Sequence, residues 1–293
     1  METHTGERQD ELTEASRSRS MGSFMKFCIL GPLNVSVCGV NGAPSAPKLR
    51  KVLGLLLLHA DEVVPVASIL KELWDDEPPR SGLTTLQTYI LHLRKLLASL
   101  AECSSDEIAR DVLVTGTGGY TFRVGRAQLD LYDFQAHLIE GRKTRGDGGW
   151  NAHAVHHLRA ALELWRGPAL VDVPAGRLLE SKIRELEEWR LVALECLIEA
   201  ELQLGMHHDV VAKLAGLTVE NPLHEGLHRQ YMLALHLGGR RAQALEVFHR
   251  LRGTLVKELG LEPAPHLQRL QQAILSGEAD VSDIPAHRHK AGC

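Results

Sequence analysis

Residues 81–98 carry side chains suited to hydrogen bonding and to neutralising negative charge. These polar side chains lie away from the apolar face of the predicted helix. They are Thr84, Thr88, Tyr89, His92, Arg94 and Lys95. Arg and Lys can bind O6 and N7 of guanine, whereas Thr can contact a base edge or the methyl group of thymine. Between Arg80 and Lys95 there are basic residues and no acidic ones. This chemistry is that of a surface that reads DNA.

The element that must position these side chains is an amphipathic helix. Its apolar positions recur at steps of four, three and four residues, at Leu86, Ile90, Leu93 and Leu97. This spacing predicts one buried stripe. Periodicity alone leaves two interpretations open: a helix that enters the major groove of DNA, and an ordinary amphipathic helix with a solvated polar face.

The neighbouring segments predict a winged helix-turn-helix. Apolar and β-branched residues at 25–40 predict short strands with a turn at Gly31-Pro32. Helices are expected at 47–59 and 66–74, and a β-hairpin at 112–124. In such a fold two helices support a third, whose exposed face enters a major groove, and the hairpin lies beside it.

After Gly125 the pattern is that of consecutive amphipathic helices. They are expected at 130–144, 151–165, 178–204, 207–220, 223–238, 241–259 and 263–276. Gly260 and Pro263 mark a helix end after Leu259. The buried stripe of that helix is predicted to comprise Leu245, Phe248, Leu251, Leu255 and Leu259.

A loose repeat suggests how these helices are arranged. Residues 201–205 (ELQLG) recur as 234–238 (ALHLG), an offset of 33 residues, near the tetratricopeptide period of about 34. Stacked helix pairs would offer a concave surface for protein partners, and a plain helical bundle is the alternative. The predicted fold is mainly α: an N-terminal winged helix-turn-helix of the α+β type, followed by an all-α tetratricopeptide-like domain.

Charge and composition set the domain boundaries and restrict the mode of binding. We expect a disordered tail at 1–24, the DNA-binding domain at 25–125, the helical domain at 126–276 and a second disordered tail at 277–293. The net charge is −4, and residues 25–125 hold ten basic and ten acidic side chains. Any DNA contact must therefore come from local placement of charge.

Several other classes of protein are not supported by the sequence. It has no apolar run of membrane-spanning length and no signal peptide, which predicts a cytoplasmic, nucleoid-associated protein. His153 and His157 lie one helical turn apart, but a solvated helix face explains them better than a metal site. Without a G-x-S-x-G, dinucleotide or phosphate-loop motif, we expect no enzyme activity, no cofactor and no metal.

Longer stretches resemble a known family. PKLRKVLGLLLLHADEVV and LKELWDDEPPRSGLTTLQTYILHLRKLL, within residues 47–97, resemble the DNA-binding domain of the Streptomyces antibiotic regulatory protein family. ALELWRGPALVDV and LHLGGRRAQALEVFHRLRGTLVKELGLEPAPHLQRLQQAIL resemble its bacterial transcriptional activation domain. Together they cover roughly residues 25–276 in the family's order, as in its small members, which lack a nucleotide-binding module.

The resemblance implies a pathway-specific activator of secondary-metabolite (antibiotic) biosynthesis genes. Its partners would be double-stranded DNA, as direct repeats upstream of promoters, and the RNA polymerase holoenzyme. A homodimer would form at least on DNA. The rival interpretation is a tetratricopeptide-like adaptor whose DNA-binding domain has degenerated. The weak basicity of the chain favours this adaptor interpretation.

Residue roles follow from the residues and the resemblance together. The six positions from Thr84 to Lys95 named above match those that face DNA in the family. Basic side chains at helix starts suit phosphate, as do polar ones on the hairpin: Lys48, Arg50, Lys51, Arg80, Thr115, Thr117 and Tyr120. A solvated charged first turn and a simple hairpin turn are the alternatives. The loop with Asp75, Asp76 and Glu77 is expected to face the polymerase. The chain departs from the family at His92, often Arg, at Leu91, usually polar, and after Thr115, where glycines replace an Arg.

Overall fold

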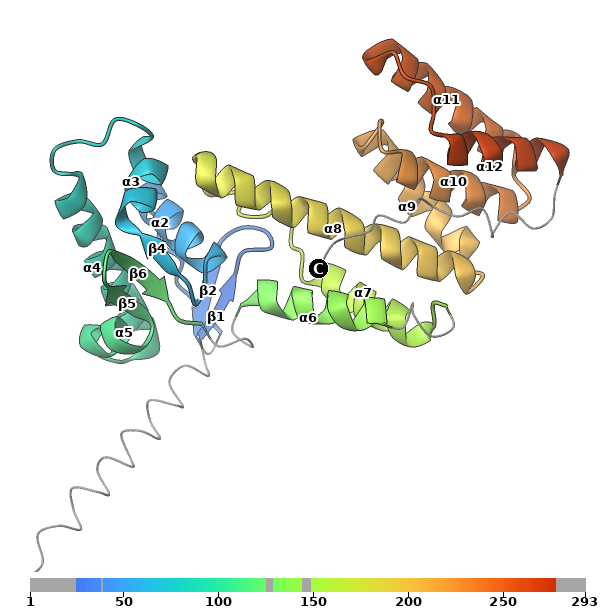
Figure 1. The fold of residues 1–293 in the computed structure, drawn as a ribbon. Helices are drawn as coiled ribbons and strands as arrows, with labels where there is room; N and C mark the ends of the chain where they lie inside the picture. The colour runs from blue at the N-terminus through green and yellow to red at the C-terminus, as the bar shows by residue number, and fades with distance from the viewer. Residues whose placement is uncertain (1–24, 38, 125–128, 144–148, 278–293) are drawn as a thin grey trace, which may run out of the picture. The chain divides into compact units, whose positions relative to one another are not determined.

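The computed structural model describes residues 25–37, 39–124, 129–143 and 149–277. The tails expected at 1–24 and after Gly277 lie outside the described residues. The chain divides into two compact units. The first contains residues up to Ile139 together with Ala160–Leu191, and the second contains Glu140–Arg159 and the residues from Val192 onward. Figure 1 shows a mainly helical chain whose strands lie in its first half, as predicted.

The first unit begins with a small antiparallel sheet. Strands β1 (Met25–Cys28), β2 (Asn34–Val37) and β3 (Val40–Asn41) pair in that order. The turn between β1 and β2 passes through Gly31, whose φ of +138° disfavours any side chain. The strands and the turn predicted from the sequence are confirmed.

Three helices follow and pack on one another: α2 (Pro47–Leu58), α3 (Val66–Trp74) and α4 (Gly82–Ala101). Proline occupies the first turn of α2, where its missing N–H costs nothing. A helix that the sequence analysis missed, α5 (Ser105–Asp111), follows α4. It begins with a capping box, in which Ser104 and Glu107 satisfy each other's backbone N–H groups.

The predicted hairpin is confirmed and has a third strand. Strands β5 (Leu113–Gly116) and β6 (Gly119–Phe122) are antiparallel, and β4 (Val63–Pro65) pairs with the other edge of β6. Since β4 lies between α2 and α3 in the chain, this pairing attaches the hairpin to the helices. A Cβ atom at Gly119 would collide with the carbonyl group of Val64, so this strand needs a glycine here.

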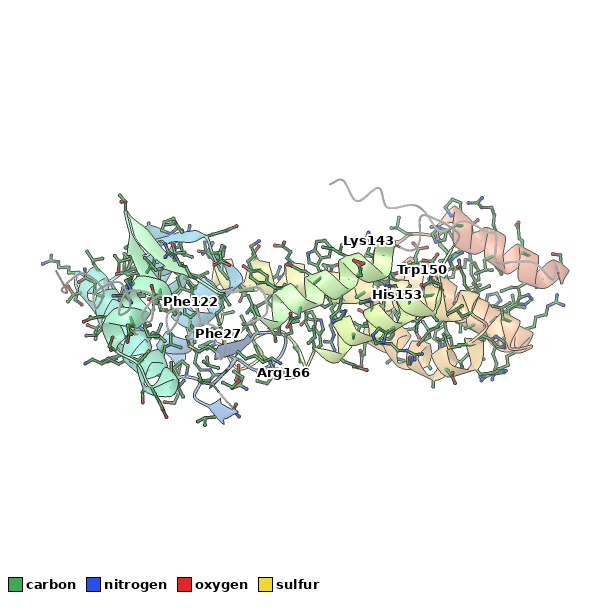
Figure 2. The ribbon with its side chains drawn as sticks, turned by 90° about the horizontal axis from the view of Figure 1, so that it is seen from below. Phe27, Phe122, Lys143, Trp150, His153 and Arg166 are labelled. Atoms are coloured by element: carbon green, nitrogen blue, oxygen red, sulfur yellow. The ribbon has the colours of Figure 1, made fainter. Side chains whose placement is uncertain are left out.

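The core of this unit joins both sheets. Phe27 of β1 and Phe122 of β6 are fully buried, and their rings meet edge to face with centroids 5.1 Å apart. Figure 2 labels this pair. Edge-to-face contact between aromatic rings is favourable because the ring edge is positive and the face negative.

The first unit also takes in segments from further along the chain. It includes the start of α6 (Asp130–Lys143), the end of α7 (Ala152–Glu163) and the start of α8 (Arg177–Gln203). The link between α7 and α8 lies against the β1–β2 turn: the Arg166 N–H donates to the Leu30 carbonyl at 2.8 Å. The Leu170 N–H donates to the carbonyl of Gly31, also at 2.8 Å.

The second unit is built from helices that pack on their neighbours in the chain. Helix α9 (His207–Glu220) packs on α10 (Glu225–Leu237), α10 on α11 (Arg241–Leu259), and α11 on α12 (Pro265–Ser276). Gly260 ends α11 with a φ of +69°, as the sequence predicted. One prediction for α11 was wrong: Leu259, the last residue of the helix before the Gly260 cap, is 53% exposed, and Leu245 is half-buried.

Candidate nucleic-acid interface

Helix α4 has one apolar and one polar face, as the periodicity predicted. Leu86, Leu93 and Leu97 are fully buried, and Ile90 is 1% exposed. A helix turns by about 100° per residue, so one line of side chains lies directly opposite this stripe. That line comprises Thr84, Thr88, Leu91 and Lys95, all exposed. The polar face is therefore a continuous surface over several turns.

Two expected contact residues flank this line. His92 is exposed, whereas Tyr89 is half-buried. The hydroxyl group of Thr88 donates to the Thr84 carbonyl at 3.0 Å, an i to i−4 bond that uses its only proton. In this conformation the Thr88 hydroxyl can accept a hydrogen bond but has none to donate.

Arg94 lies on the flank of α4 that faces the hairpin. Its Nε and Nη2 atoms donate to the Leu113 carbonyl at 3.0 and 2.7 Å, and Nη2 also donates to Thr115 Oγ1 at 2.8 Å. Burial lowers the pKa of Arg94 from its ordinary value. The guanidinium group therefore joins α4 to β5, and its Nε and Nη2 atoms donate hydrogen bonds within the protein.

The basic residues at the start of α2 are also engaged within the unit. Arg50 forms an ion pair with Asp172 and donates to the Pro44 carbonyl at 2.9 Å, and its side chain is 15% exposed. Lys51 Nζ donates to the Glu72 carbonyl at 3.2 Å. Lys48 is exposed, with Nζ lying 4.7 Å from the centre of the Trp74 ring. Of the three, Lys48 is the most accessible to phosphate.

The hairpin residues divide in the same way. Thr115 and Thr117 are exposed, whereas Tyr120 is 6% exposed, lies opposite Thr115 in the β5–β6 register and belongs to the core. Gly118 at the tip has a φ of +80°. The tip presents backbone and threonine hydroxyl groups, with no cation of its own.

The loop between α3 and α4 is acidic and exposed. Asp75, Asp76, Glu77 and Arg80 all face solvent. Arg177, in the first turn of α8, lies 4.0 Å from a carboxylate oxygen of both Asp75 and Asp76. Exposed pairs at this distance contribute little energy, so the loop remains available to a partner.

A buried carboxylate that was not predicted from the sequence lies beside this loop. Glu72 is 2% exposed, and its carboxylate accepts hydrogen bonds from the N–H groups of Gly176, Leu178 and Leu179 at 2.5, 2.9 and 3.3 Å. It therefore caps the start of α8, where free N–H groups and the helix dipole favour negative charge. The available signal was an acidic residue between the buried Ile69 and Leu73 of α3.

Asp130 is a second buried carboxylate that was not predicted from the sequence. It is 2% exposed, and its carboxylate accepts from the Ile29 N–H at 2.9 Å and the Leu30 N–H at 3.1 Å. Burial is the main influence on its pKa and raises it, whereas these hydrogen bonds and Arg166 act in the opposite direction. Both carboxylates join segments about a hundred residues apart in the chain, a pairing that no local pattern reveals.

The part of the chain that the structure describes shows neither a cluster of metal ligands nor a membrane-spanning helix. There, no cluster of three or more His, Cys, Asp or Glu side chains is placed to hold a metal ion. The rings of His153 and His157 pack against each other, with centroids 4.4 Å apart. Among the described helices, none combines the length and apolar character needed to cross a membrane.

Comparison with known proteins gives matches along most of the chain. Residues 129–275 match the model of the bacterial transcriptional activator domain, and residues 43–118 match that of the C-terminal part of transcriptional regulatory proteins. Regulatory protein DnrI of Streptomyces peucetius is 44% identical over 266 residues, which are 89% of this chain and 97% of DnrI. Regulatory protein AfsR of Streptomyces coelicolor is 36% identical over 263 residues, 89% of this chain and 25% of AfsR.

A solved structure shares the fold. The structure of Mycobacterium tuberculosis EmbR in complex with a low affinity phosphopeptide superposes with a TM-score of 0.82 at 32% sequence identity. The match covers 88% of this chain and 66% of that one.

Proposed function

This chain belongs to the Streptomyces antibiotic regulatory protein family of transcriptional regulators, and from that premise we propose how it reads DNA and activates transcription. Helix α4 enters the major groove of promoter DNA, with the line of Thr84, Thr88, Leu91 and Lys95 toward the bases. The observation that carries the proposal is the contrast between this exposed line and the fully buried one opposite it. The protein acts as a regulator and not as an enzyme.

Phosphate contacts come from the edges of this surface. Lys95 and Arg80 are exposed cations of α4 and its entrance, Lys48 is exposed at the start of α2, and Thr117 is exposed at the hairpin tip. Arg50, Lys51, Arg94 and Tyr120, which the sequence suggested as DNA contacts, are assigned to supporting roles because of their internal bonds or burial. These phosphate contacts would position the protein, and the base contacts of α4 would supply the specificity.

The acidic loop between α3 and α4 faces RNA polymerase in this proposal. Exposure of Asp75, Asp76 and Glu77 supports it, since carboxylates there would repel DNA phosphates but suit a basic protein surface. Replacing all three with Ala should not weaken DNA binding, because it removes negative charge, and should reduce transcription from a target promoter in vitro. Normal transcription by that variant would refute the assignment.

We further propose that two molecules bind direct repeats upstream of promoters of biosynthetic genes. The test is enrichment of genomic fragments by the purified full chain, followed by footprinting of the best fragment. A protected pair of direct repeats spaced by about one helical turn supports the proposal. The control is Thr84→Asp/Lys95→Asp, which places carboxylates on the exposed line. Equal enrichment by this variant at low salt would instead favour the adaptor interpretation.

A further inference from the structure

Leu91 is an apolar side chain at the centre of the surface proposed to enter the groove. It is 45% exposed and lies between Thr88 and Lys95 on the exposed line of α4. The line spans an arc of about 60° on a regular helix, directly opposite the buried stripe. Elsewhere on a surface an exposed leucine carries no information. Here it lies on the face proposed to enter the groove, where it would meet the edge of a base.

The major groove offers such a side chain one suitable partner. Each base pair shows hydrogen-bond donors and acceptors there, and the apolar feature is the C5-methyl group of thymine. Leucine against a guanine, cytosine or adenine edge would remove water from polar atoms without replacing their hydrogen bonds, which is unfavourable. Leucine against a thymine methyl removes apolar surface from water on both sides.

The neighbouring side chain strengthens this preference. The Thr88 hydroxyl group donates its proton to the Thr84 carbonyl at 3.0 Å, so the residue preceding Leu91 on the line has no donor for a base. The cationic group of Lys95 lies on the other side, one turn further along α4. The centre of the line is therefore poor in donors.

We propose that Leu91 determines sequence specificity by contacting the methyl group of a thymine within each binding site. This inference rests on the proposed function, because it assumes that α4 enters the major groove. It adds the identity of one base and the atom that is read.

Replacement of thymine by deoxyuridine isolates that atom, since uracil keeps the O4 acceptor and the pairing of thymine and lacks only the methyl group. The best genomic site is synthesised with each thymine replaced in turn, and the affinity of the full chain is measured. We expect wild type to lose roughly fourfold in affinity at one thymine per site, the value of one buried methyl group. Leu91→Ala should bind the two forms of that site equally.

Two further variants complete the test. Leu91→Met keeps an apolar side chain and should retain the preference for thymine. Leu261→Ala removes a leucine that is 58% exposed in the second unit, after α11, and should behave as wild type. The inference is overturned if wild type binds every uracil-containing site as tightly as the original, or if Leu91→Ala keeps the same penalty. If wild type enriched no DNA at all, the proposed function would be overturned as well. That result differs from DNA binding without a preference for thymine, so the two failures can be told apart.

Discussion

At the scale of single residues, the positive charges of the DNA-binding region fall into two groups. Arg94 and Arg50 donate to carbonyl groups of their own unit, whereas Lys95 is exposed on α4. Both groups look alike in the sequence, because each is a basic residue on the polar side of a helix. What distinguishes them is contact with distant segments. Arg94 bonds the hairpin, and Arg50 pairs with Asp172 in the link between α7 and α8.

Arg94→Ala should destabilise the protein and, through the hairpin, weaken DNA binding. The substitution leaves the carbonyl group of the buried Leu113 without these two hydrogen bonds, at a cost of about 1–3 kcal/mol. Chemical denaturation followed by circular dichroism measures the change. Unchanged stability with reduced DNA affinity would instead show that Arg94 leaves the hairpin to contact DNA directly.

Lys95→Ala should weaken DNA binding without altering stability, because the side chain is exposed. If its ammonium group neutralises one phosphate, the slope of log affinity against log salt concentration should become shallower by about 0.9. The loss should be similar for specific and random DNA. A titration in which the slope stays the same would remove Lys95 from the set of phosphate contacts.

At the scale of elements, periodicity predicted what depends on local sequence. The positions of α2, α3 and α4, the hairpin and the buried stripe from Leu86 to Leu97 followed from apolar spacing. Helix α5 was missed because its seven residues are too few and too polar for a stripe, although Ser104 and Glu107 spell a capping box. The carboxylate contacts of Glu72 and Asp130 could not be predicted, because their partners are other segments' backbone N–H groups.

Glu72 joins α3 to the start of α8 through its carboxylate group. Glu72→Ala removes the acceptor for the N–H groups of Gly176, Leu178 and Leu179. We expect a loss of about 2 kcal/mol in the free energy of unfolding, at the upper end for a helix cap. Glu77→Ala, in the exposed loop nearby, is the matched control and should change it by less than about 0.5 kcal/mol. Equal effects of the two substitutions would contradict the capping role.

At the scale of the whole molecule, charge does not distinguish this protein as a DNA-binding one. The net charge is −4, and the DNA-binding region is balanced. In the proposed function, contacts with DNA and RNA polymerase are made mainly by one face of α4 and by the loop before it. The fold contributes by joining distant segments of the first unit, through the pairing of β4 with β6 and the buried carboxylates of Glu72 and Asp130.

Stability of the molecule should depend on pH through a buried histidine of the second unit. His228 is 5% exposed; burial is the main cause that lowers its pKa, and the positive charges of His224 and Arg250 act in the same direction. The His224 carbonyl and Glu225 oppose the shift. The unfolded chain therefore binds more protons, and stability should fall as the pH decreases through about 6.5.

His228→Gln should make the free energy of unfolding less dependent on pH between about 7 and 5. His249→Gln, on the exposed side of α11, is the control and should keep the wild-type dependence. Denaturant titrations at several pH values measure both slopes. An identical slope in wild type and His228→Gln would show that the acid sensitivity arises elsewhere.

The central claim is that the exposed line of α4 reads the major groove, and dimethyl sulfate protection tests it most directly. The reagent methylates N7 of guanine in the major groove and N3 of adenine in the minor groove. On the best genomic site the account predicts protection of guanine N7 in both repeats, lost in Thr84→Asp/Lys95→Asp. Protection confined to adenine N3, or a pattern unchanged by those substitutions, would contradict it.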